Sequence, residues 1–109
     1  MKKIIILLSI SLFLIGCSAF QPSEFTVKVY SSVPYQGQYL VAQIDGKSSS
    51  TSISGNGQNT YILKGQSISF SAQKQSQQGE ILIEVIKNGN IIKSERTSAP
   101  YGIAMITTD

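Results

Sequence analysis

The sequence predicts an all-β domain: a small antiparallel β-sandwich of immunoglobulin-like layout, with about seven strands, that follows a cleaved N-terminal signal peptide. Three observations carry this prediction. No stretch of useful length after Glu24 shows helical periodicity. Ile, Val, Tyr, Phe and Thr dominate the apolar segments, and these residues fit a pleated, half-buried surface. Turn signals recur about every ten to fifteen residues, which is the spacing of a small sandwich or barrel.

The chain divides into a signal peptide (residues 1–16), an acylated cysteine with a short tether (residues 17–24) and the β-sandwich domain (residues 25–109). Lys2 and Lys3 give the start a positive charge, and residues 4–15 are apolar apart from two serines. As a helix this apolar stretch spans roughly 18 Å, whereas the hydrocarbon core of a bilayer is about 30 Å thick. The stretch therefore has the shape of a secretory signal rather than of a membrane-spanning helix.

The apolar stretch ends in Leu14-Ile15-Gly16-Cys17, which resembles the lipobox of bacterial lipoproteins. The resemblance implies cleavage before Cys17, a diacylglycerol on its sulfur and an acyl chain such as palmitate on its new amino group. Two or three chains anchor a protein firmly, because each buried methylene contributes about 0.8 kcal/mol. An uncleaved signal anchor with a chance cysteine is the alternative. Ser18 stands where an Asp retains Gram-negative lipoproteins in the inner membrane, so the resemblance implies the outer membrane if the host is Gram-negative.

Strands are expected at residues 25–33, 38–44, 47–54, 58–64, 66–74, 80–87, 90–97 and 101–107. The first and fifth alternate apolar and polar side chains, as a strand with one buried face does. Their apolar positions are Phe25, Val27 and Val29 in the first and Ile68, Phe70 and Ala72 in the fifth.

The strongest local signal is a hairpin around Asn88-Gly89, a pair that tolerates the positive φ angles of a type I′ turn. The turn sets Lys87 opposite Asn90. The register then places Val85 opposite Ile92, Ile86 opposite Ile91 and Glu84 opposite Lys93, and it puts Ile81, Ile83, Val85 and Ile92 on a common core face. Asp45-Gly46 indicates a second hairpin whose return strand, rich in Ser and Thr, is either a ragged edge or a loop. Residues 54–57 are expected to form a turn, and residues 73–79 an exposed loop.

The amino-acid composition excludes most catalytic mechanisms. The chain has no His, and its one Cys is Cys17, so Ser-His-Asp and Cys-His catalysis are excluded. A Ser-Lys dyad stays formally open. Glu80 and Glu84 share a strand face but lie roughly 13 Å apart, so they are expected to be solvated surface acids rather than a glycosidase pair. No catalytic residue, metal site or cofactor is expected, and an enzyme is the least favoured reading.

Charge and aromatic content point to a neutral surface. Loss of the leader leaves seven basic and six acidic side chains, which argues against a nucleic-acid partner. Five tyrosines could line a binding groove, although such residues are more often half-buried strand positions with a solvated hydroxyl. They are Tyr30, Tyr35, Tyr39, Tyr61 and Tyr101.

The stretch from Ser69 to the C-terminus resembles the C-terminal half of the MmpS-type small membrane proteins and their lipoprotein relatives. A Ser-Ala-Gln strand end, a Gly-x-Ile-x-Val-like strand, an Asn-Gly turn and a Tyr-Gly-Ile-Ala closing strand carry the resemblance. The matching positions are Ala72, Gln73, Gly79, Ile81, Ile83, Val85, Asn88, Gly89, Ile91, Ile92, Tyr101, Gly102 and Ala104. The chain lacks the tryptophan that family members often have and the C-terminal cysteine pair of the mycobacterial members. It also has a lipobox where the mycobacterial members have a membrane-spanning helix. The resemblance implies a compact β-sandwich outside the membrane and an accessory role to an RND-type exporter.

The expected function is that of a lipid-anchored, non-catalytic binding or accessory module of the cell envelope, on the extracytoplasmic side. Its expected partners are the membrane, through the lipid anchor, and an envelope protein such as a transporter. The alternative is a surface inhibitor or exclusion lipoprotein that acts against a lysozyme or a phage. A hydrolase of envelope polymers is a distant third.

Overall fold

The computed structural model describes residues 23–108, which fold as an all-β unit with no helix in that range. The strands are β1 (Ser23–Ala42), β2 (Ser48–Gly65), β3 (Ser67–Lys74), β4 (Ile81–Lys87), β5 (Asn90–Thr97) and β6 (Ile103–Thr107). Every strand pair is antiparallel. The prediction of an antiparallel all-β fold is thereby confirmed.

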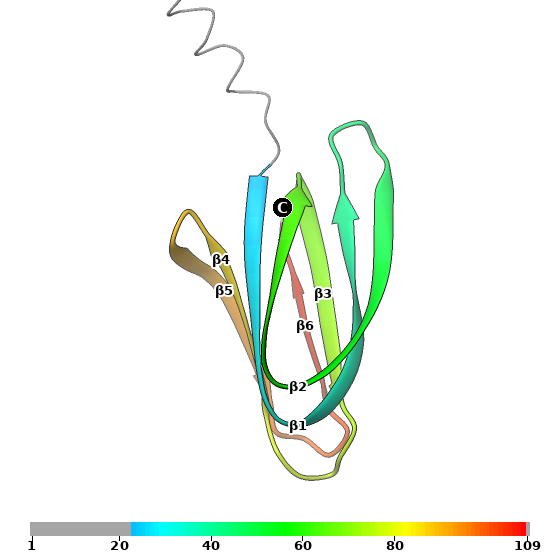
Figure 1. Ribbon diagram of the computed structural model, residues 1–109, viewed down its shortest axis with the longest axis vertical. Coiled ribbons are helices and arrows are strands. Elements are labelled where there is room, and N and C mark those ends of the chain that lie inside the picture. The colour runs from blue at the N-terminus through cyan, green and yellow to red at the C-terminus, as the bar shows by residue number, and fades with distance from the viewer. Residues whose placement is uncertain (1–22, 109) are drawn as a thin grey trace, which may run out of the picture.

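The strands form one sheet in the order β5-β4-β1-β3-β6, and β2 pairs with β1 off that path (Figure 1). The sheet curls until its two end strands, β5 and β6, approach each other and nearly close a barrel. Lys93 on β5 bridges them, because its Nζ donates a hydrogen bond to the Thr107 carbonyl oxygen on β6 at 2.6 Å.

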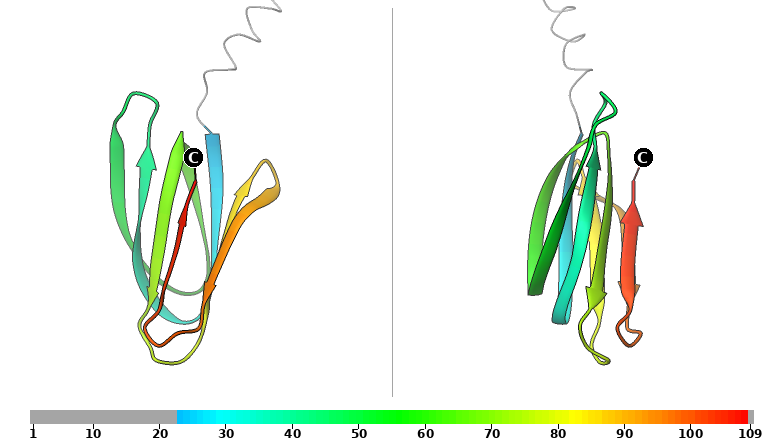
Figure 2. Two further views of the ribbon diagram at one scale, coloured as in Figure 1. Left: turned by 180° about the vertical axis from the view of Figure 1, so that it is seen from behind. Right: turned by 90° about the vertical axis from the view of Figure 1, so that its right-hand side faces the viewer.

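Strands β1 and β2 are long because both bend and continue into a second layer (Figure 2). The first half of β1 pairs with the second half of β2 and with β4, while its second half pairs with the first half of β2 and with β3. With β5 and β6 added at the ends, each half of β1 belongs to a layer of four strand segments. This arrangement is compatible with a small β-sandwich.

Eight strand segments were expected, and the structure has six strands because two expected breaks are bends instead. Pro34 lies in the first bend, where the pairing of β1 with β2 shifts register between Ser31 and Tyr35. A residue without an N–H is tolerated at such a bulge. In β2 the expected turn at residues 54–57 is a bend within the strand. Gly55 pairs with Tyr35 and Gly57 pairs with Ser31 on either side of it, and Gly57 has a φ of 76°.

The core lies between the layers and follows the expected alternation. The buried apolar residues are Phe25, Val27, Val29, Tyr35, Val41, Leu63, Ile68, Phe70, Ala72, Ile81, Ile83, Val85, Ala104 and Ile106. Tyr39, Ile53 and Tyr61 pack against them at its edge. The predicted inward faces of residues 25–33 and 66–74 are therefore confirmed.

The predicted register of the Asn88-Gly89 hairpin is confirmed at the turn and is wrong beyond it. Asn88 and Gly89 have φ angles of 54° and 78°, as a type I′ turn requires. Lys87 faces Asn90 and Ile86 faces Ile91, as expected.

A register shift between Val85 and Ile86 then sets Val85 opposite Lys93 and Glu84 opposite Ser94. The expected pairs Val85–Ile92 and Glu84–Lys93 are therefore absent. Ile92 is 44% exposed, so its assignment to the core was wrong. A bulge of this kind places an extra residue in one strand and displaces every pair after it.

The second hairpin forms at Asp45-Gly46. The Gly46 N–H donates to the Gln43 carbonyl oxygen at 3.1 Å, and the Gln43 N–H donates to the Lys47 carbonyl oxygen at 2.8 Å. The return segment is a true ladder strand, because residues 48–54 pair with residues 36–42 of β1. It is exposed on almost all of its length, so it is an edge rather than a loop.

Candidate functional site

The predicted lipidation site, Cys17, lies outside the described residues 23–108. It precedes Ser23, the first residue of β1, by six positions, and an extended chain of that length reaches about 21 Å. Whatever Cys17 is attached to, the folded domain begins close to it.

Ser23 starts at the same end of the domain as the tips of the two hairpins (Figure 1). The Gln43 side-chain amide donates to the Lys64 carbonyl oxygen at 3.2 Å, which ties the first hairpin to the end of β2. Lys64 also lies 3.7 Å from the Glu24 carboxylate, and the Lys87 ammonium lies 5.4 Å from the centre of the Phe25 ring. This end thus combines lysines with an acid, and its net charge is small.

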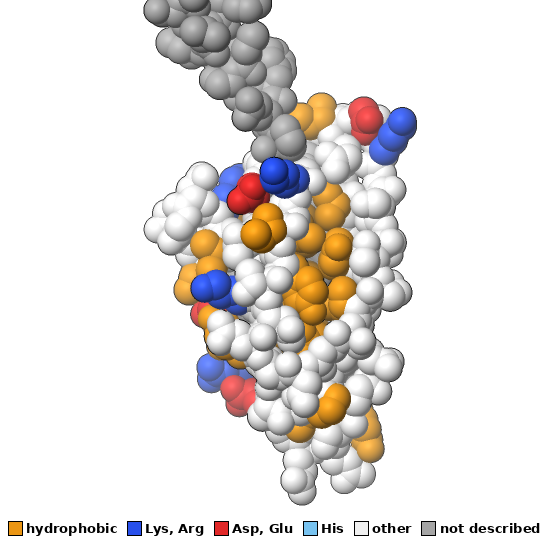
Figure 3. Space-filling model, viewed as in Figure 1, with side chains coloured by type: hydrophobic (Ala, Val, Ile, Leu, Met, Phe, Trp, Pro, Cys, Tyr) orange, Lys and Arg blue, Asp and Glu red, His pale blue; other side chains and the backbone are white. Residues whose placement is uncertain are grey.

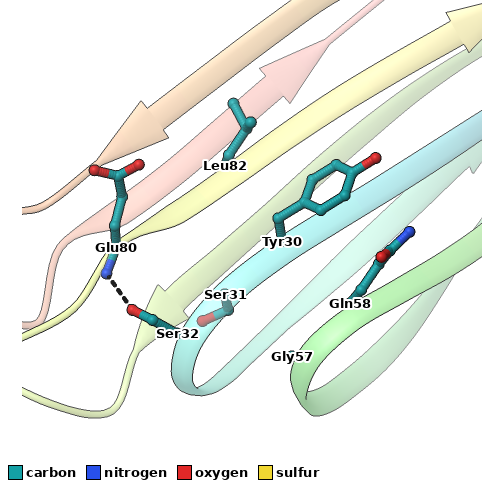
Figure 4. Close-up of a pocket in the computed structure, with 7 residues that line it drawn as sticks. All are labelled: Tyr30, Ser31, Ser32, Gly57, Gln58, Glu80 and Leu82. Atoms are coloured by element: carbon teal, nitrogen blue, oxygen red, sulfur yellow. Dashed lines mark hydrogen bonds between the residues drawn. The ribbon is translucent and has the colours of Figure 1, made fainter.

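A cleft of about 420 Å³ lies on the outer face of the domain, over β1, β2 and β4 (Figure 4). Cross-strand neighbours form its floor, because Tyr30 of β1 pairs with both Gln58 of β2 and Leu82 of β4. Its remaining lining residues are Ser31, Ser32, Gly57 and Glu80. The cleft is open and mixes an aromatic ring, an aliphatic side chain and an amide.

Hydrogen bonds already engage most of the reactive groups at this cleft. The Ser32 hydroxyl oxygen accepts the Glu80 N–H at 2.9 Å, and the Ser31 hydroxyl donates to the Val33 carbonyl oxygen. The Glu80 carboxylate lies 3.0 Å from the Arg96 guanidinium. No base faces either serine among these contacts, so none of them activates a serine as a nucleophile.

The two acids singled out in the sequence have different neighbours. Glu80 precedes β4 and pairs with Arg96, whereas Glu84 lies in β4 opposite Lys28 of β1 and Ser94 of β5. Residues 23–108 contain no cluster of three metal-binding side chains of the His, Cys, Asp or Glu type.

The five tyrosines do not line one groove. Tyr30 lies on the outer-face cleft and Tyr101 is 52% exposed in a loop, whereas the other three converge at the core. Tyr61 lies 6.3 Å from Tyr39 and 5.4 Å from Phe70, measured between ring centroids.

Polar contacts bind this aromatic group together. The hydroxyl groups of Tyr35 and Tyr61 are 2.9 Å apart, and the Asn59 amide donates to the Tyr35 oxygen at 3.0 Å. Burial and the hydrogen bond with Tyr61 raise the pKa of Tyr35 above its ordinary value, although donation from Asn59 opposes the rise. Tyr35 is therefore a neutral phenol that links β1 to β2 through these contacts.

Sequence reasoning missed Lys74, which was expected in an exposed loop and is fully buried at the end of β3. Its Nζ donates to the Ala99 carbonyl oxygen at 2.6 Å and so fixes the loop between β5 and β6. The alternation of Ile68, Phe70 and Ala72 places residue 74 on the same inward face, but the polar stretch that follows predicts an exposed loop.

Residues 71–74 have Ser-x-x-Lys spacing, a linear pattern that sequence reasoning also missed. Such spacing marks the Ser-Lys pair of some acyl-transfer enzymes, where it lies on a helix. On the extended β3, positions three apart face opposite sides. Lys74 points into the core while Ser71 lies on the outer face, so the two do not form a dyad.

No protein-family model, no curated protein and no solved structure matches this chain. Within residues 23–108, no helix is long and apolar enough to cross a membrane.

Proposed function

We propose that this chain is a bacterial lipoprotein whose β domain serves as a non-catalytic binding or accessory module in the cell envelope. One observation carries the proposal: an apolar segment of signal-peptide length ends in Leu14-Ile15-Gly16-Cys17. Acyl chains on Cys17 would hold the domain against the extracytoplasmic face of a membrane, because the tether is short.

Features of the described domain support a module without chemistry of its own. The serines at the outer-face cleft are engaged in hydrogen bonds, and the nearby Glu80 carboxylate is paired with Arg96. The cleft instead offers an aromatic ring, an aliphatic side chain and an amide, which suit recognition of a ligand that has both an apolar face and hydrogen-bonding groups.

Metabolic labelling with radioactive palmitate tests the anchor. We expect label in the wild-type chain, a mature mass that corresponds to loss of residues 1–16, and a membrane-bound product. Cys17→Ala should abolish the label and the cleavage, while the matched variant Ser18→Ala should retain both. An unlabelled wild-type band, or a Cys17→Ala chain of unchanged size, contradicts the proposal.

The choice of partner follows from the resemblance to the MmpS-type proteins, which favours an envelope exporter of the RND type. Chemical cross-linking in intact cells, followed by affinity purification from detergent, tests this choice. Recovery of a transporter subunit supports it. Inhibition of lysozyme by the purified chain would favour the inhibitor role instead.

A further inference from the structure

The first half of β2, residues 48–54, is a strand edge without a partner. It pairs with β1 on one side, and among residues 23–108 no strand pairs with its other side. Its sequence is Ser-Ser-Ser-Thr-Ser-Ile-Ser, and all of these side chains except Ile53 are exposed. Figure 3 shows apolar side chains gathered beside this segment, between the two halves of β2.

The direction of the free backbone groups follows from the hairpin. The Gln43 N–H donates to the Lys47 carbonyl oxygen, so Gln43 and Lys47 form a hydrogen-bonded pair. In an antiparallel ladder hydrogen-bonded and non-hydrogen-bonded pairs alternate, so every second pair of β1 and β2 beyond this one is hydrogen-bonded. Ser49, Thr51 and Ile53 therefore bond to β1. The residues between them direct their N–H and C=O groups outward, and these are Ser48, Ser50, Ser52 and Ser54.

Natural sheets protect such edges with charges, proline, bulges or short strands, because unpaired edges recruit other strands. The other free edges of this domain have these features. Strand β5 carries Lys93, Glu95 and Arg96 and pairs through a bulge. Strand β6 is only five residues long, and the second half of β2 carries Lys64 next to its end. Residues 48–54 have none of them.

We propose that residues 48–54 pair antiparallel with the same residues of a second copy of this chain, about a twofold axis at Thr51. This register sets Ser50 opposite Ser52 of the other copy and Ser48 opposite Ser54, so all four outward-directed residues on each side bond. Thr51 faces its own equivalent in a non-hydrogen-bonded position, where side chains are closest.

A second copy fits this edge better than a charged partner does. Residues 48–54 carry no charged side chain, so no like charges meet when this segment pairs with itself. Isologous pairing through one edge also closes at two copies and leaves no edge of the same kind exposed. A seven-residue strand pair is small beside a standard interface of about 1,600 Å², so the dimer should dissociate on dilution and form where chains are concentrated.

Cysteine cross-linking in intact expressing cells tests the pairing and its register. The full chain is made with Thr51→Cys or with Ser49→Cys, two exposed positions on the same strand face. In the proposed dimer the two copies of residue 51 are adjacent, whereas the copies of residue 49 are about 13 Å apart, beyond the reach of a disulfide. The unmodified chain, whose only cysteine is Cys17, measures any background.

After mild oxidation we expect a disulfide dimer from Thr51→Cys in about tenfold excess over Ser49→Cys, because only the former pair has disulfide geometry. Equal yields of disulfide-linked dimer from the two variants indicate random collision and overturn the proposal. Absence of a dimer from Thr51→Cys overturns it as well. Cross-linking of Thr51→Cys to a different protein assigns the edge to another partner and also overturns it.

Ser50→Pro in the Thr51→Cys background removes an outward-directed N–H that no strand of the domain uses, and edge positions tolerate proline. We expect cross-linking to fall about tenfold, since both copies lose a hydrogen bond, while Ser50→Ala leaves it unchanged. Ser50→Lys combined with Ser52→Lys sets lysines directly opposite each other in the dimer and should also abolish the dimer. Persistence of the dimer in a folded chain with both lysines refutes the pairing.

None of these outcomes requires lipid on Cys17, so failure of the dimer and failure of the lipoprotein proposal are separate results.

Discussion

The hydroxyl groups of Tyr35 and Tyr61 lie 2.9 Å apart and join the bend of β1 to the second half of β2. Tyr35 is buried, and the Asn59 amide provides a third member of the network at 3.0 Å. The contact connects residues 26 positions apart in the sequence. It therefore holds the two bent strands together at the point where they pass from one layer to the other.

Tyr35→Phe should lower the free energy of unfolding by about 1–2 kcal/mol, because Tyr61 and Asn59 each lose a buried partner. Urea denaturation of the purified domain measures the change. Tyr101→Phe is the matched control, since Tyr101 is exposed, and it should alter stability by less than about 0.5 kcal/mol. Equal effects of the two substitutions would show that the network contributes nothing.

Stability should decline in alkali through Tyr35. Its pKa in the folded state is raised, chiefly by burial, above the value near 10 of a free phenol. The folded state therefore holds this proton more tightly than the unfolded state, and the stabilisation is complete below pH 10 and lost as the pH rises further. Thermal melts between pH 8 and pH 11.5 should show a steeper loss in the wild type than in Tyr35→Phe. Parallel losses would contradict the assignment.

Ile83→Ala should destabilise the domain by about 2–5 kcal/mol, enough to unfold much of so small a fold. Ile83 is fully buried in the centre of β4 and is a member of the hydrophobic core. Ile103→Ala is the control, because Ile103 is 57% exposed on β6. Calorimetry should find a large drop in Tm for the first and a shift of a few degrees at most for the second. A small shift for Ile83→Ala would remove that residue from the core.

Lys74→Met should unfold at the same denaturant concentration as the wild type or at a higher one. Burial of an ammonium group costs several kcal/mol, and an apolar side chain of similar volume avoids that cost. The Ala99 carbonyl oxygen stays bonded in the variant, because it also accepts the Gly102 N–H at 2.9 Å.

Lys74→Ala serves as the contrast, since it leaves a cavity and should lose about 2 kcal/mol or more. Guanidinium unfolding of both variants distinguishes packing from charge. A large loss in Lys74→Met would show that the ammonium itself is needed.

Much of the fold follows from local pattern. The alternation of Ile68 and Phe70 with serines gives the inward face of β3, and Asn88-Gly89 fixes its own turn. These features depend on neighbouring residues alone, so the sequence predicts them.

Other features depend on the assembled domain. The bulge at Val85 and Ile86 expels Ile92 from the core, although its side chain suits burial. Pro34 reads as the end of a strand, yet it occupies a register shift within β1. Lys74 sits in a polar run and is buried because the loop at Ala99 closes over it. Each outcome is decided by contacts between residues distant in the sequence.

One candidate site can be predicted from a local sequence pattern, and the other cannot. Cys17 stands out in the sequence because lipid attachment is read from a short linear motif. The outer-face cleft brings Tyr30, Gln58 and Leu82 together from three strands, and no linear pattern predicts that meeting.

The bends of β1 and β2 make the domain indivisible. Each layer takes one half of both strands, so neither layer can be excised as a contiguous fragment of the chain. A single proteolytic cut within either strand deprives both layers of a segment at once. Unfolding should therefore be all-or-none, with no half-domain surviving digestion.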